Sequence, residues 1–548
     1  MNPLIDTPGP TRSARGRAPF SSPLTWAAAA LAITLLLTVS VRLRLLSMPL
    51  ERDEGEFAYL GQLMLQGIPP YKLAFNMKLP GTYAAYAGIM GLFGQSPAGI
   101  HFGFLLVNLA ALALLFLVAR RFLDSLGALV SCTAYALLTA TPLLDGLQGH
   151  ATHLVALAAL AGLLLLLRAR ENGRAREFFL AGLFLGIAFL CKQPGLFFGL
   201  FAGLLLIWDR LTRRTASWKE CARRLSLLSS GFVLPFLTVC LLLWRAGTFA
   251  RFWFWTVQYV RVHAGVMPLS YGRDRLLSLF TDPLAAGTLL AVIFGFICLW
   301  FKPNGAEKQL FLTGWLFFSA CAVASGFYFT SHYFIAALPA ACLFLALGVS
   351  TATAWLSRRG APASLLPVAI FIAACLWVIW DNHTIWLEMP PDIACLDTYP
   401  ADPFVECREV ADFIRQHSAP ADEIAVVGSE PEIYFYARRH SASGYIYMYD
   451  LVETQPYAQM MQREFMRDVE THRPLYLVFV NIRTSWMAFP RADRTIFDWS
   501  RSYPAKYYDL AGMAVIYPKY TEYLWGNDAS LDKVKSSSSI LVFRRKSP

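Results

Sequence analysis

The segment Glu51–Tyr59 (ERDEGEFAY) places three carboxylates, those of Glu51, Asp53 and Glu54, within four residues, directly after a long uncharged run. Acidic side chains close to lipid cost desolvation free energy, so a protein rarely keeps them there without a function. A carboxylate at a membrane edge with a second acid beside it can have a raised pKa, in the range useful for proton transfer. Proton transfer is therefore the chemistry that these residues could perform.

A purely structural explanation accounts for part of the same segment. Asp53 and Glu56 have the spacing of a helix N-cap and its capping box, and the apolar residues that follow share one helical face. This interpretation predicts an amphipathic helix that lies along the outer membrane surface and is capped by Asp53. It gives no role to the cluster Arg52-Asp53-Glu54, or to Lys78 in the downstream motif NMKLPG.

The composition is that of an integral membrane protein. Of the 548 residues, 56% are hydrophobic and only 16% are charged. The uncharged stretch Ala18–Val41 is long enough to cross a bilayer, for which a helix needs about 20 apolar residues. Arg42 and Arg44 make its end a poor cleavage site for a signal peptide, so we predict a retained first span.

Further apolar runs bring the expected number of membrane spans to about eleven. They are centred near Leu105, Ala136, Leu160, Leu185, Leu204, Leu237, Ile293, Phe317, Leu343 and Phe371. Short basic connectors follow alternate spans, and the positive-inside rule assigns them to the cytoplasm. With the N-terminus inside and an odd number of spans, the acidic segment and the chain after about Trp386 lie outside.

Beyond about Pro390 the sequence alternates between helical and strand-like segments, including the runs LYLVFV, MAVIYP and SILVF. Such alternation predicts a small α/β domain. We therefore expect an α-helical polytopic membrane protein with three parts. These are a disordered cytoplasmic tail at 1–17, a transmembrane catalytic domain at 18–388 with a first outer loop at about 49–97, and a soluble extracytoplasmic α/β domain at 389–548.

The formal net charge of +11 is explained mostly by the basic connectors. No basic-aromatic motif of a nucleic-acid module is present, so nucleic acid is not expected as a partner. Arg261 and Arg273 differ from the connector arginines because they fall in a predicted outer loop, where basic charge has no topological role. They are candidates to bind an anion.

The cysteines show no CxxC pair and no other spacing typical of metal ligands. We expect no metal and no other cofactor, although the sequence leaves a divalent ion open. Cys395 and Cys407 both fall outside, where an oxidising compartment and suitable geometry would allow a disulfide.

Lys192 interrupts an apolar stretch in the motif CKQPG, and Pro194 suggests a break where two spans meet at the outer face. An ionisable residue at such depth is a functional candidate, here for a substrate cavity. A loop lysine between two short helices is the alternative.

Four motifs, in this order, resemble the GT-C superfamily of membrane glycosyltransferases. The segment RDEGEFAYLGQLMLQGIPPYKLAFNMKLPGTY resembles the first outer loop of that superfamily, with an Asp-Glu pair after the first span and a lysine near the end of the loop. The others are LAGLFLGIAFLCKQPGLFFGL, SHYFIAALPAACLFLALG and VADFIRQHSAPADEIAVVGSEPEIYFYARR. The resemblance covers most of the chain. It is strongest to bacterial enzymes similar to protein O-mannosyltransferases and to lipid A aminoarabinose and galacturonic acid transferases.

The resemblance implies inverting transfer of a sugar from a polyprenyl-phosphate carrier to a cell-envelope acceptor, at the outer face of the inner membrane. It makes Asp53 the general base and gives Glu54 a role beside it, in positioning the acceptor or sharing the proton. It assigns the donor phosphate to Lys78, with Arg261 or Arg273 as a second ligand. A lysine that reaches lipid headgroups is the alternative for Lys78.

The resemblance also places Tyr59, His332 and Tyr333 at the substrate cavity, although an interfacial aromatic belt would equally explain Tyr333. The chain departs from its relatives at the outer start of the fourth span. Relatives often carry an acid there, and this chain has His150 and His153 instead. We assign His153 to the cavity, where a histidine can bind a sugar hydroxyl but cannot act as a permanent anion.

Two other functions fit a polytopic protein. A transporter or flippase of a lipid-linked or anionic substrate would place charge within its spans and often shows repeated halves, neither of which is evident. A receptor or scaffold would not need an acid and a lysine on one loop. The sequence names neither the sugar nor the acceptor, which could be a lipid, a polysaccharide or a protein.

Overall fold

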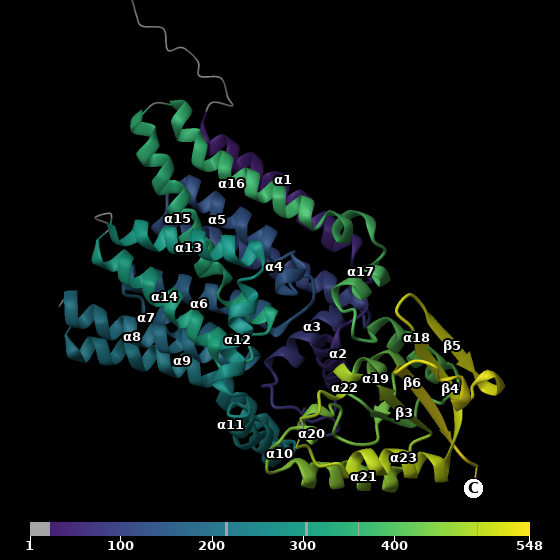
Figure 1. Cartoon of the computed structure of the whole chain (residues 1–548). Coiled ribbons are helices and arrows are strands. Elements are labelled where there is room, and N and C mark those ends of the chain that lie inside the picture. Colours follow the sequence, from purple (N-terminus) through teal and green to yellow (C-terminus); the bar gives the residue numbers. More distant parts are fainter. Residues whose placement is uncertain (1–21, 214–216, 302–304, 360, 490, 548) are drawn as a thin grey trace, which may run out of the picture.

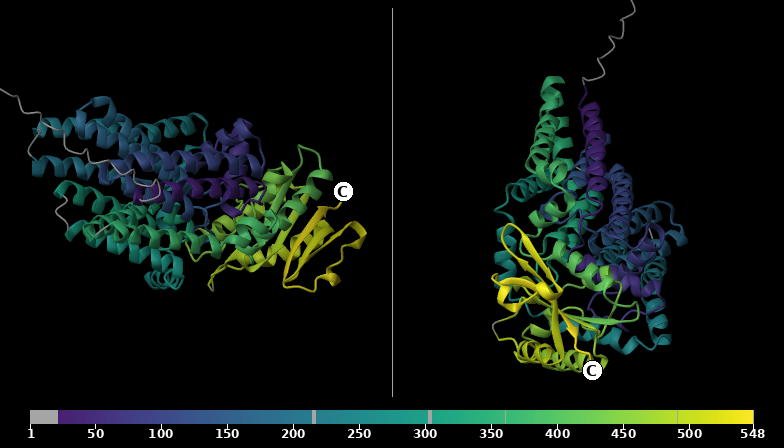
Figure 2. Two further views of the ribbon diagram at one scale, coloured as in Figure 1. Left: turned by 90° about the horizontal axis from the view of Figure 1, so that it is seen from above. Right: turned by 90° about the vertical axis from the view of Figure 1, so that its right-hand side faces the viewer.

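The computed structural model describes residues 22–213, 217–301, 305–359, 361–489 and 491–547. The long helices form one bundle, and a sheet flanked by helices lies at one end of it, as Figure 1 and Figure 2 show. We call this end of the bundle the sheet end and the opposite end the far end. The expected tail at 1–17 lies outside the described residues.

Each predicted span falls on a helix of the bundle. These helices are α1 (Pro23–Arg44), α4 (Pro97–Phe122), α5 (Ser125–Leu138), α6 (Ala151–Asn172), α7 (Ala175–Cys191), α8 (Leu196–Arg213), α9 (Trp218–Arg245), α13 (Pro283–Phe301), α14 (Ala306–Ala324), α15 (Leu338–Leu356) and α16 (Ala361–Asp381). Eight of the described helices are long and apolar enough to cross a membrane, whereas α5, α7 and α14 fall short. The chain is thus a polytopic α-helical membrane protein, and the number eleven stays a prediction.

Helices α7 and α9 pack with their backbones in close contact, and glycine makes this possible. A Cβ atom on Gly182 would lie 2.0 Å from the carbonyl oxygen of Leu228, and one on Gly231 would lie 2.0 Å from that of Phe179. Small residues of this kind hold membrane helices together, because lipid offers no hydrophobic drive for their association. The pair gives the loop that follows α7 a fixed position.

Ion pairs join the helix ends at the far end of the bundle (Figure 1). Arg170 at the end of α6 binds Asp209 of α8 through two bonds of 2.6 and 2.7 Å and Glu307 of α14 at 3.0 Å. Arg121 of α4 pairs with Glu171. Several basic connectors therefore share one end of the bundle, which is the arrangement that the positive-inside rule requires. The side of the membrane that this end occupies stays a prediction.

The C-terminal part contains a six-stranded sheet with the strand order β2-β1-β3-β6-β4-β5. Its strands are β1 (Glu423–Val427), β2 (His440–Ser441), β3 (Tyr476–Asn481), β4 (Tyr508–Ile516), β5 (Thr521–Trp525) and β6 (Ser538–Arg545). Helices α18 (Phe404–Gln416), α19 (Glu432–Ala437), α20 (Tyr449–Val452), α21 (Ala458–His472), α22 (Arg483–Trp486) and α23 (Thr495–Tyr507) accompany them. The expected small α/β fold is confirmed.

The sheet is parallel on one side and antiparallel on the other. Strand β1 pairs in parallel with β2 and with β3, where Ala425 lies opposite Leu477. Strand β6 runs antiparallel to both β3 and β4. The run Ile424–Val427 is fully buried, as a continuous apolar strand covered on both faces should be.

Short helices lie between the bundle and the sheet. They are α2 (Arg52–Leu65), α3 (Gly81–Phe93), α10 (Phe249–Trp253), α11 (Val260–His263), α12 (Leu269–Leu279) and α17 (Pro391–Thr398). Helix α2 packs against α3 on one side and α19 on another. A Cβ atom on Gly55 would lie 2.5 Å from the Cβ atom of Glu432, so α2 and α19 are in direct contact.

The prediction of an amphipathic surface helix capped by Asp53 is wrong. Every residue from Glu54 to Leu63 is buried, because the C-terminal domain covers the face of α2 that would otherwise be exposed. The N-cap is Glu51, whose carboxylate accepts hydrogen bonds from the backbone N–H groups of Asp53 (2.9 Å) and Glu54 (2.8 Å). Glu54 completes the capping box, so the carboxylate of Asp53 is left for other contacts.

The proposed disulfide is also not formed. Cys395 and Cys407 are both free thiols, and both are buried. Cys395 packs in a small apolar cluster with Met48 and Phe404, where a reduced cysteine behaves as a small hydrophobic residue.

Candidate active site

The site is built around the first turn of α2. Asp53 and Glu56 are three residues apart, so their carboxylates lie on the same face of the helix. The ammonium nitrogen of Lys78 binds both of them, at 2.9 Å from Asp53 Oδ1 and 2.7 Å from Glu56 Oε2. The same ammonium lies 4.6 Å from the ring centre of Phe57, within the range of a cation–π contact.

Hydrogen bonds between side chains and the backbone of the same loop hold Lys78 in place. The hydroxyl of Tyr71 donates to the Lys78 carbonyl oxygen at 2.7 Å, and the Lys78 N–H donates to Asn76 Oδ1 at 3.0 Å. A Cβ atom on Gly81 would lie 2.5 Å from the carbonyl oxygen of Leu190, so only glycine lets the loop approach the end of α7 this closely.

The two carboxylates that bind Lys78 differ in their electrostatics. Burial raises the pKa of Asp53, but the charge of Lys78, its hydrogen bond to the carboxylate and the neighbouring His332 and His150 together outweigh burial, and the net pKa lies well below the ordinary value. Burial dominates at Glu56, which has no exposed surface, and raises its pKa to about 7. Burial lowers the pKa of Lys78, but Asp53 and Glu56 more than reverse this, so the lysine stays charged. The site thus contains one permanent anion and one acid that titrates near neutrality.

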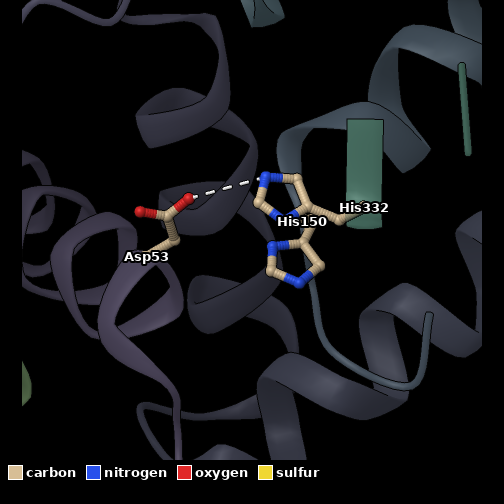
Figure 3. A group of neighbouring side chains, drawn as sticks. All are labelled: Asp53, His150 and His332. Carbon is tan, nitrogen blue, oxygen red and sulfur yellow. Dashed lines mark ion pairs between the residues drawn. The ribbon is translucent and has the colours of Figure 1, made fainter. Parts of the chain in front are cut away.

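Two histidines, His150 and His332, lie close to Asp53, as Figure 3 shows. His332, in the 3-10 turn η4 (Ser331–Ala336), has its Nε2 atom 3.9 Å from Asp53 Oδ2. The ring of His150, the residue before α6, stacks on the ring of His332 with centres 3.9 Å apart and planes 11° apart. Burial lowers the pKa of His150 to about 4 and that of His332 well below its ordinary value, so both rings are neutral at pH 7.

Lys192 completes the cationic side of the site. It follows α7 directly, and its ammonium lies 3.6 Å from the ring centre of Tyr333. Burial lowers its pKa to about 7. The neighbouring Gln193 donates to the carbonyl oxygen of Met77 at 2.7 Å, so the CKQPG turn packs on the Lys78 loop. Lys192 therefore lies in the turn between α7 and α8, as one alternative expected, and it also lies beside the candidate site, as the other expected.

The C-terminal domain contributes a residue that the sequence analysis missed. The hydroxyl of Tyr447 donates to Asp53 Oδ1 at 3.2 Å, across 394 positions of chain. No local signal marks this tyrosine, because its role depends on a tertiary contact. Glu56 did carry a signal, since it shares a helix face with Asp53, but that spacing was interpreted only as a cap.

The structure thus brings together, beside His150, five of the residues that the sequence analysis assigned to the site: Asp53, Lys78, Lys192, His332 and Tyr333. It separates the others from this group. Glu54 has no exposed surface, accepts a bond from the Gly149 N–H and pairs with His101 Nε2 at 3.0 Å. These contacts fix α2 on α4 and engage the Glu54 carboxylate in the protein interior.

The assignment of Tyr59 to the substrate cavity is wrong. Tyr59 is fully buried, its ring stacks on Tyr434 with centres 5.1 Å apart, and its hydroxyl accepts a bond from the Ser441 N–H at 2.8 Å. It therefore belongs to the interface between α2 and the C-terminal domain. The spacing of residues along α2 could not have decided this, because burial against a domain and burial in a cavity give the same pattern.

The histidine that reaches the site is His150 and not His153. His153 lies one turn into α6, 1% exposed, with its ring 6.1 Å from that of Phe104. Neither outer-loop arginine forms an ion pair with Asp53 among the described residues. Arg261 on α11 is exposed, and Arg273 is exposed and pairs with the adjacent Asp274.

Asp53, His150 and His332 could hold a divalent cation. One potential ligand atom of each lies within 4.8 Å of the others, and both ring nitrogens of His150 are buried without a hydrogen-bond partner in the described part of the chain. Imidazole and carboxylate are ordinary ligands of such ions. The three residues come from three separate segments, so their spacing in the sequence gave no sign of this arrangement.

Comparisons with known proteins place the fold of the chain among solved structures. The family model described as dolichyl-phosphate-mannose-protein mannosyltransferase matches residues 78–244. No curated protein matches the sequence. The fold is similar to ArnT from Cupriavidus metallidurans bound to undecaprenyl phosphate, with a TM-score of 0.56, 15% identity and coverage of 94% of this chain and 97% of that one.

The fold is also similar to the archaeal oligosaccharyltransferase AglB from Archaeoglobus fulgidus in complex with an inhibitory peptide and a dolichol-phosphate. That match has a TM-score of 0.54 and 14% identity and covers 95% of this chain and 76% of that chain. Both proteins are GT-C glycosyltransferases, and the region matched by the mannosyltransferase model contains Lys78, His150 and Lys192. The chain therefore has the fold of the GT-C membrane glycosyltransferases, as its motifs predicted.

Proposed function

We propose that the protein is an inverting glycosyltransferase that moves a sugar from a polyprenyl-phosphate carrier to an acceptor in the cell envelope, at the outer face of the inner membrane. The observation that carries the proposal is the position of Lys78, held between Asp53 and Glu56 at the sheet end of the bundle. A base and a phosphate ligand are the two groups that such a transfer requires, and they are in contact here.

In the proposed reaction an acceptor hydroxyl attacks the anomeric carbon from the face opposite the phosphate. Asp53 takes the hydroxyl proton as the new C–O bond forms, and the bond from the anomeric carbon to the phosphate oxygen breaks with its electron pair leaving on the phosphate. Lys78 stabilises the departing phosphate as a point charge. Attack from the opposite face inverts the anomeric configuration.

The same contact explains how the base is kept inactive before the donor binds. While Lys78 is bound to Asp53, the pKa of this carboxylate is low and it is a weak base. A donor phosphate competes for Lys78, and any weakening of the ion pair makes Asp53 more basic. Lys192, whose pKa burial lowers to about 7, would gain a proton near the same anion. Donor binding and base activation are thereby coupled.

Two proteins of similar fold support the proposed class of donor. ArnT from Cupriavidus metallidurans was solved with undecaprenyl phosphate, and AglB from Archaeoglobus fulgidus with a dolichol-phosphate. A carrier of this type would reach the site from the lipid, while the acceptor would approach from the C-terminal domain. Glu54 acts in this proposal as a positioning residue for α2, through His101.

A deletion strain tests the proposal. Mass analysis of its envelope glycolipids, polysaccharides and glycoproteins should reveal one missing sugar, and the wild-type gene should restore it. The variant Asp53→Asn should not restore it, whereas Asp274→Asn, which alters an exposed acid, should do so. Restoration by Asp53→Asn would rule out the proposed base.

A further inference from the structure

A second cluster of ionisable side chains lies outside the proposed active site, where the segment after α9 meets the C-terminal domain. His263 at the end of α11 has its Nδ1 atom 3.1 Å from Glu453 Oε2. Asp450 of α20 lies beside Glu453, and one potential ligand atom of each of the three residues lies within 4.8 Å of the others. One nitrogen and two carboxylates thus converge from two separate parts of the chain.

The two carboxylates of this cluster are buried without a matching positive charge. Asp450 and Glu453 are each 5% exposed. Within the described ranges, neither forms an ion pair with a lysine or an arginine, and His263 is the sole ion-pair partner of Glu453. Buried carboxylates cost several kcal/mol unless a cation or a metal ion compensates them. Within the described residues, His263 is thus the one basic side chain that forms an ion pair with these two buried carboxylates.

The hydrogen bonds to these two carboxylates come from few donors. The hydroxyl of Tyr259 lies 2.9 Å from Asp450 Oδ1 and 3.1 Å from Glu453 Oε2, but a hydroxyl has one proton and can donate to only one of them. In the described part of the chain, Asp450 Oδ2 and Glu453 Oε1 accept no hydrogen bond from a side chain. These two oxygens are therefore open to a further ligand.

The separations suit a small divalent cation. Two ligands about 2.0 to 2.2 Å from a tetrahedral zinc ion lie about 3.4 Å apart, close to the 3.1 Å between His263 and Glu453. Side-chain rotation of Asp450 would bring the third ligand to the same distance, with water as the fourth. One imidazole nitrogen and two carboxylate oxygens favour zinc over magnesium, which prefers oxygen ligands alone.

We propose that His263, Asp450 and Glu453 bind a Zn²⁺ ion that fastens the C-terminal domain to the segment after α9. The site is separate from Asp53 and does not depend on the proposed glycosyl transfer. Its position gives it a consequence for that transfer, because Asp450 lies three residues after Tyr447, whose hydroxyl contacts Asp53. A metal ion at Asp450 and Glu453 fixes the short segment that brings Tyr447 to the active site.

Metal binding to the purified full-length protein tests the proposal. The detergent-solubilised protein is freed of metal with a chelator, dialysed against Zn²⁺ or Co²⁺ alone, and analysed for bound metal and for the visible absorption of bound Co²⁺. We expect one equivalent in the wild type. His263→Gln, Asp450→Asn and Glu453→Gln should each weaken binding by about tenfold or more, because each removes a ligand.

Three controls separate this site from other sources of binding. Tyr259→Phe keeps all three ligands and should keep the metal. His472→Gln alters another histidine–carboxylate pair, the exposed contact of 2.8 Å to Glu423, and should have no effect. His150→Gln removes a ligand of the cluster at Asp53 and should also leave the equivalent in place.

Two results would overturn the proposal. If the wild type takes up no Zn²⁺, the positive charge at this cluster is a protonated His263. If His150→Gln loses the metal while Glu453→Gln retains it, the cation belongs to the cluster at Asp53. Because a ligand variant could fail to fold, each variant is first compared with the wild type by circular dichroism without metal, and three independent ligand variants are available.

Discussion

Tyr447 of the C-terminal domain donates a hydrogen bond of 3.2 Å to the same Asp53 oxygen that binds Lys78. The membrane bundle and the C-terminal domain therefore meet at the carboxylate for which we propose the central chemical role. The ring of Tyr447 also lies 5.9 Å from the Lys78 ammonium, so one aromatic side chain contacts both partners of the ion pair.

Replacing Asp53 by asparagine should abolish most of the transfer while leaving the protein folded. The amide keeps the size of the side chain but cannot take a proton, and loss of a general base typically lowers the rate by about 10²- to 10⁴-fold. Turnover of the purified enzyme and its melting curve should be measured together. A turnover within a few-fold of the wild type would remove Asp53 from the mechanism.

Replacing Lys78 by alanine should weaken binding of undecaprenyl phosphate by about 1.5 to 3 kcal/mol, the range for a hydrogen bond to a charged group. Lys72→Ala is the matched control, since Lys72 is an exposed lysine on the same loop. Native mass spectrometry or a thermal-shift titration would report both affinities. Equal losses in the two variants would indicate attraction to the membrane in general and not a phosphate site.

The acid with a pKa near 7 gives the protein a predictable dependence on pH. Because burial raises the pKa of Glu56 from its ordinary 4.5 to about 7, the folded state holds a proton that the unfolded state has lost between these two values. The stability contributed by this group should fall as the pH rises from about 4.5 to 7. Melting temperatures across this range should fall less steeply in Glu56→Gln. If the melting temperatures of the two proteins changed in parallel with pH, the pKa of Glu56 would not be raised into this range.

Removing the hydroxyl of Tyr447 should change the pKa of Asp53 while leaving Asp53 and Lys78 themselves unaltered. Tyr447→Phe deletes a hydrogen bond that stabilises the ionised carboxylate, worth about 0.5 to 1.5 kcal/mol. The pKa of Asp53 should rise, and the acidic limb of the rate profile should move to higher pH by about one unit or less. Tyr445→Phe is the control, because its hydroxyl binds Glu464 and not Asp53. The same shift in both variants would assign the effect to the domain as a whole.

The predicted topology can be tested independently of activity. Cys407 is fully buried, so a new thiol is needed as a probe. Lys519→Cys on the turn between β4 and β5 and Lys219→Cys at the start of α9 are both exposed positions. An impermeant maleimide applied to intact spheroplasts should label the first and not the second. The reverse pattern would place the C-terminal domain and Asp53 in the cytoplasm.

The sequence predicted the fold well where a single local pattern decides the outcome. Apolar runs of bilayer length fall on the helices of the bundle, because in lipid a chain must satisfy its backbone hydrogen bonds within each segment. The strand-like runs after Pro390 became β3, β4 and β6 for the same kind of reason. The motif NMKLPG drew attention to Lys78 because it resembles the end of the first outer loop in the GT-C superfamily.

The sequence failed where two local patterns were equally good. Glu51 and Glu54 have the same spacing as Asp53 and Glu56, so either pair could form the capping box. Lys78 binds Asp53 and Glu56, which leaves Glu51 and Glu54 to form the capping box. These contacts link residues 25 and 22 positions apart, so no local pattern could reveal them. His150 and His153 were equally ambiguous, because the start of α6 could not be placed to within one turn. Tyr447 had no local pattern at all.

Helix α2 rests on α19, so the membrane part of the molecule does not end where its last long helix ends. A chain cut after α16 would retain the predicted spans but would expose Tyr59, Leu60 and their neighbours, which are fully or almost fully buried in the intact protein. It would also leave Asp53 without its tyrosine donor. The membrane-embedded half is thus expected to misfold or aggregate when produced alone. Any shortened form of the protein should therefore retain the C-terminal domain, which covers α2 and contacts Asp53 through Tyr447.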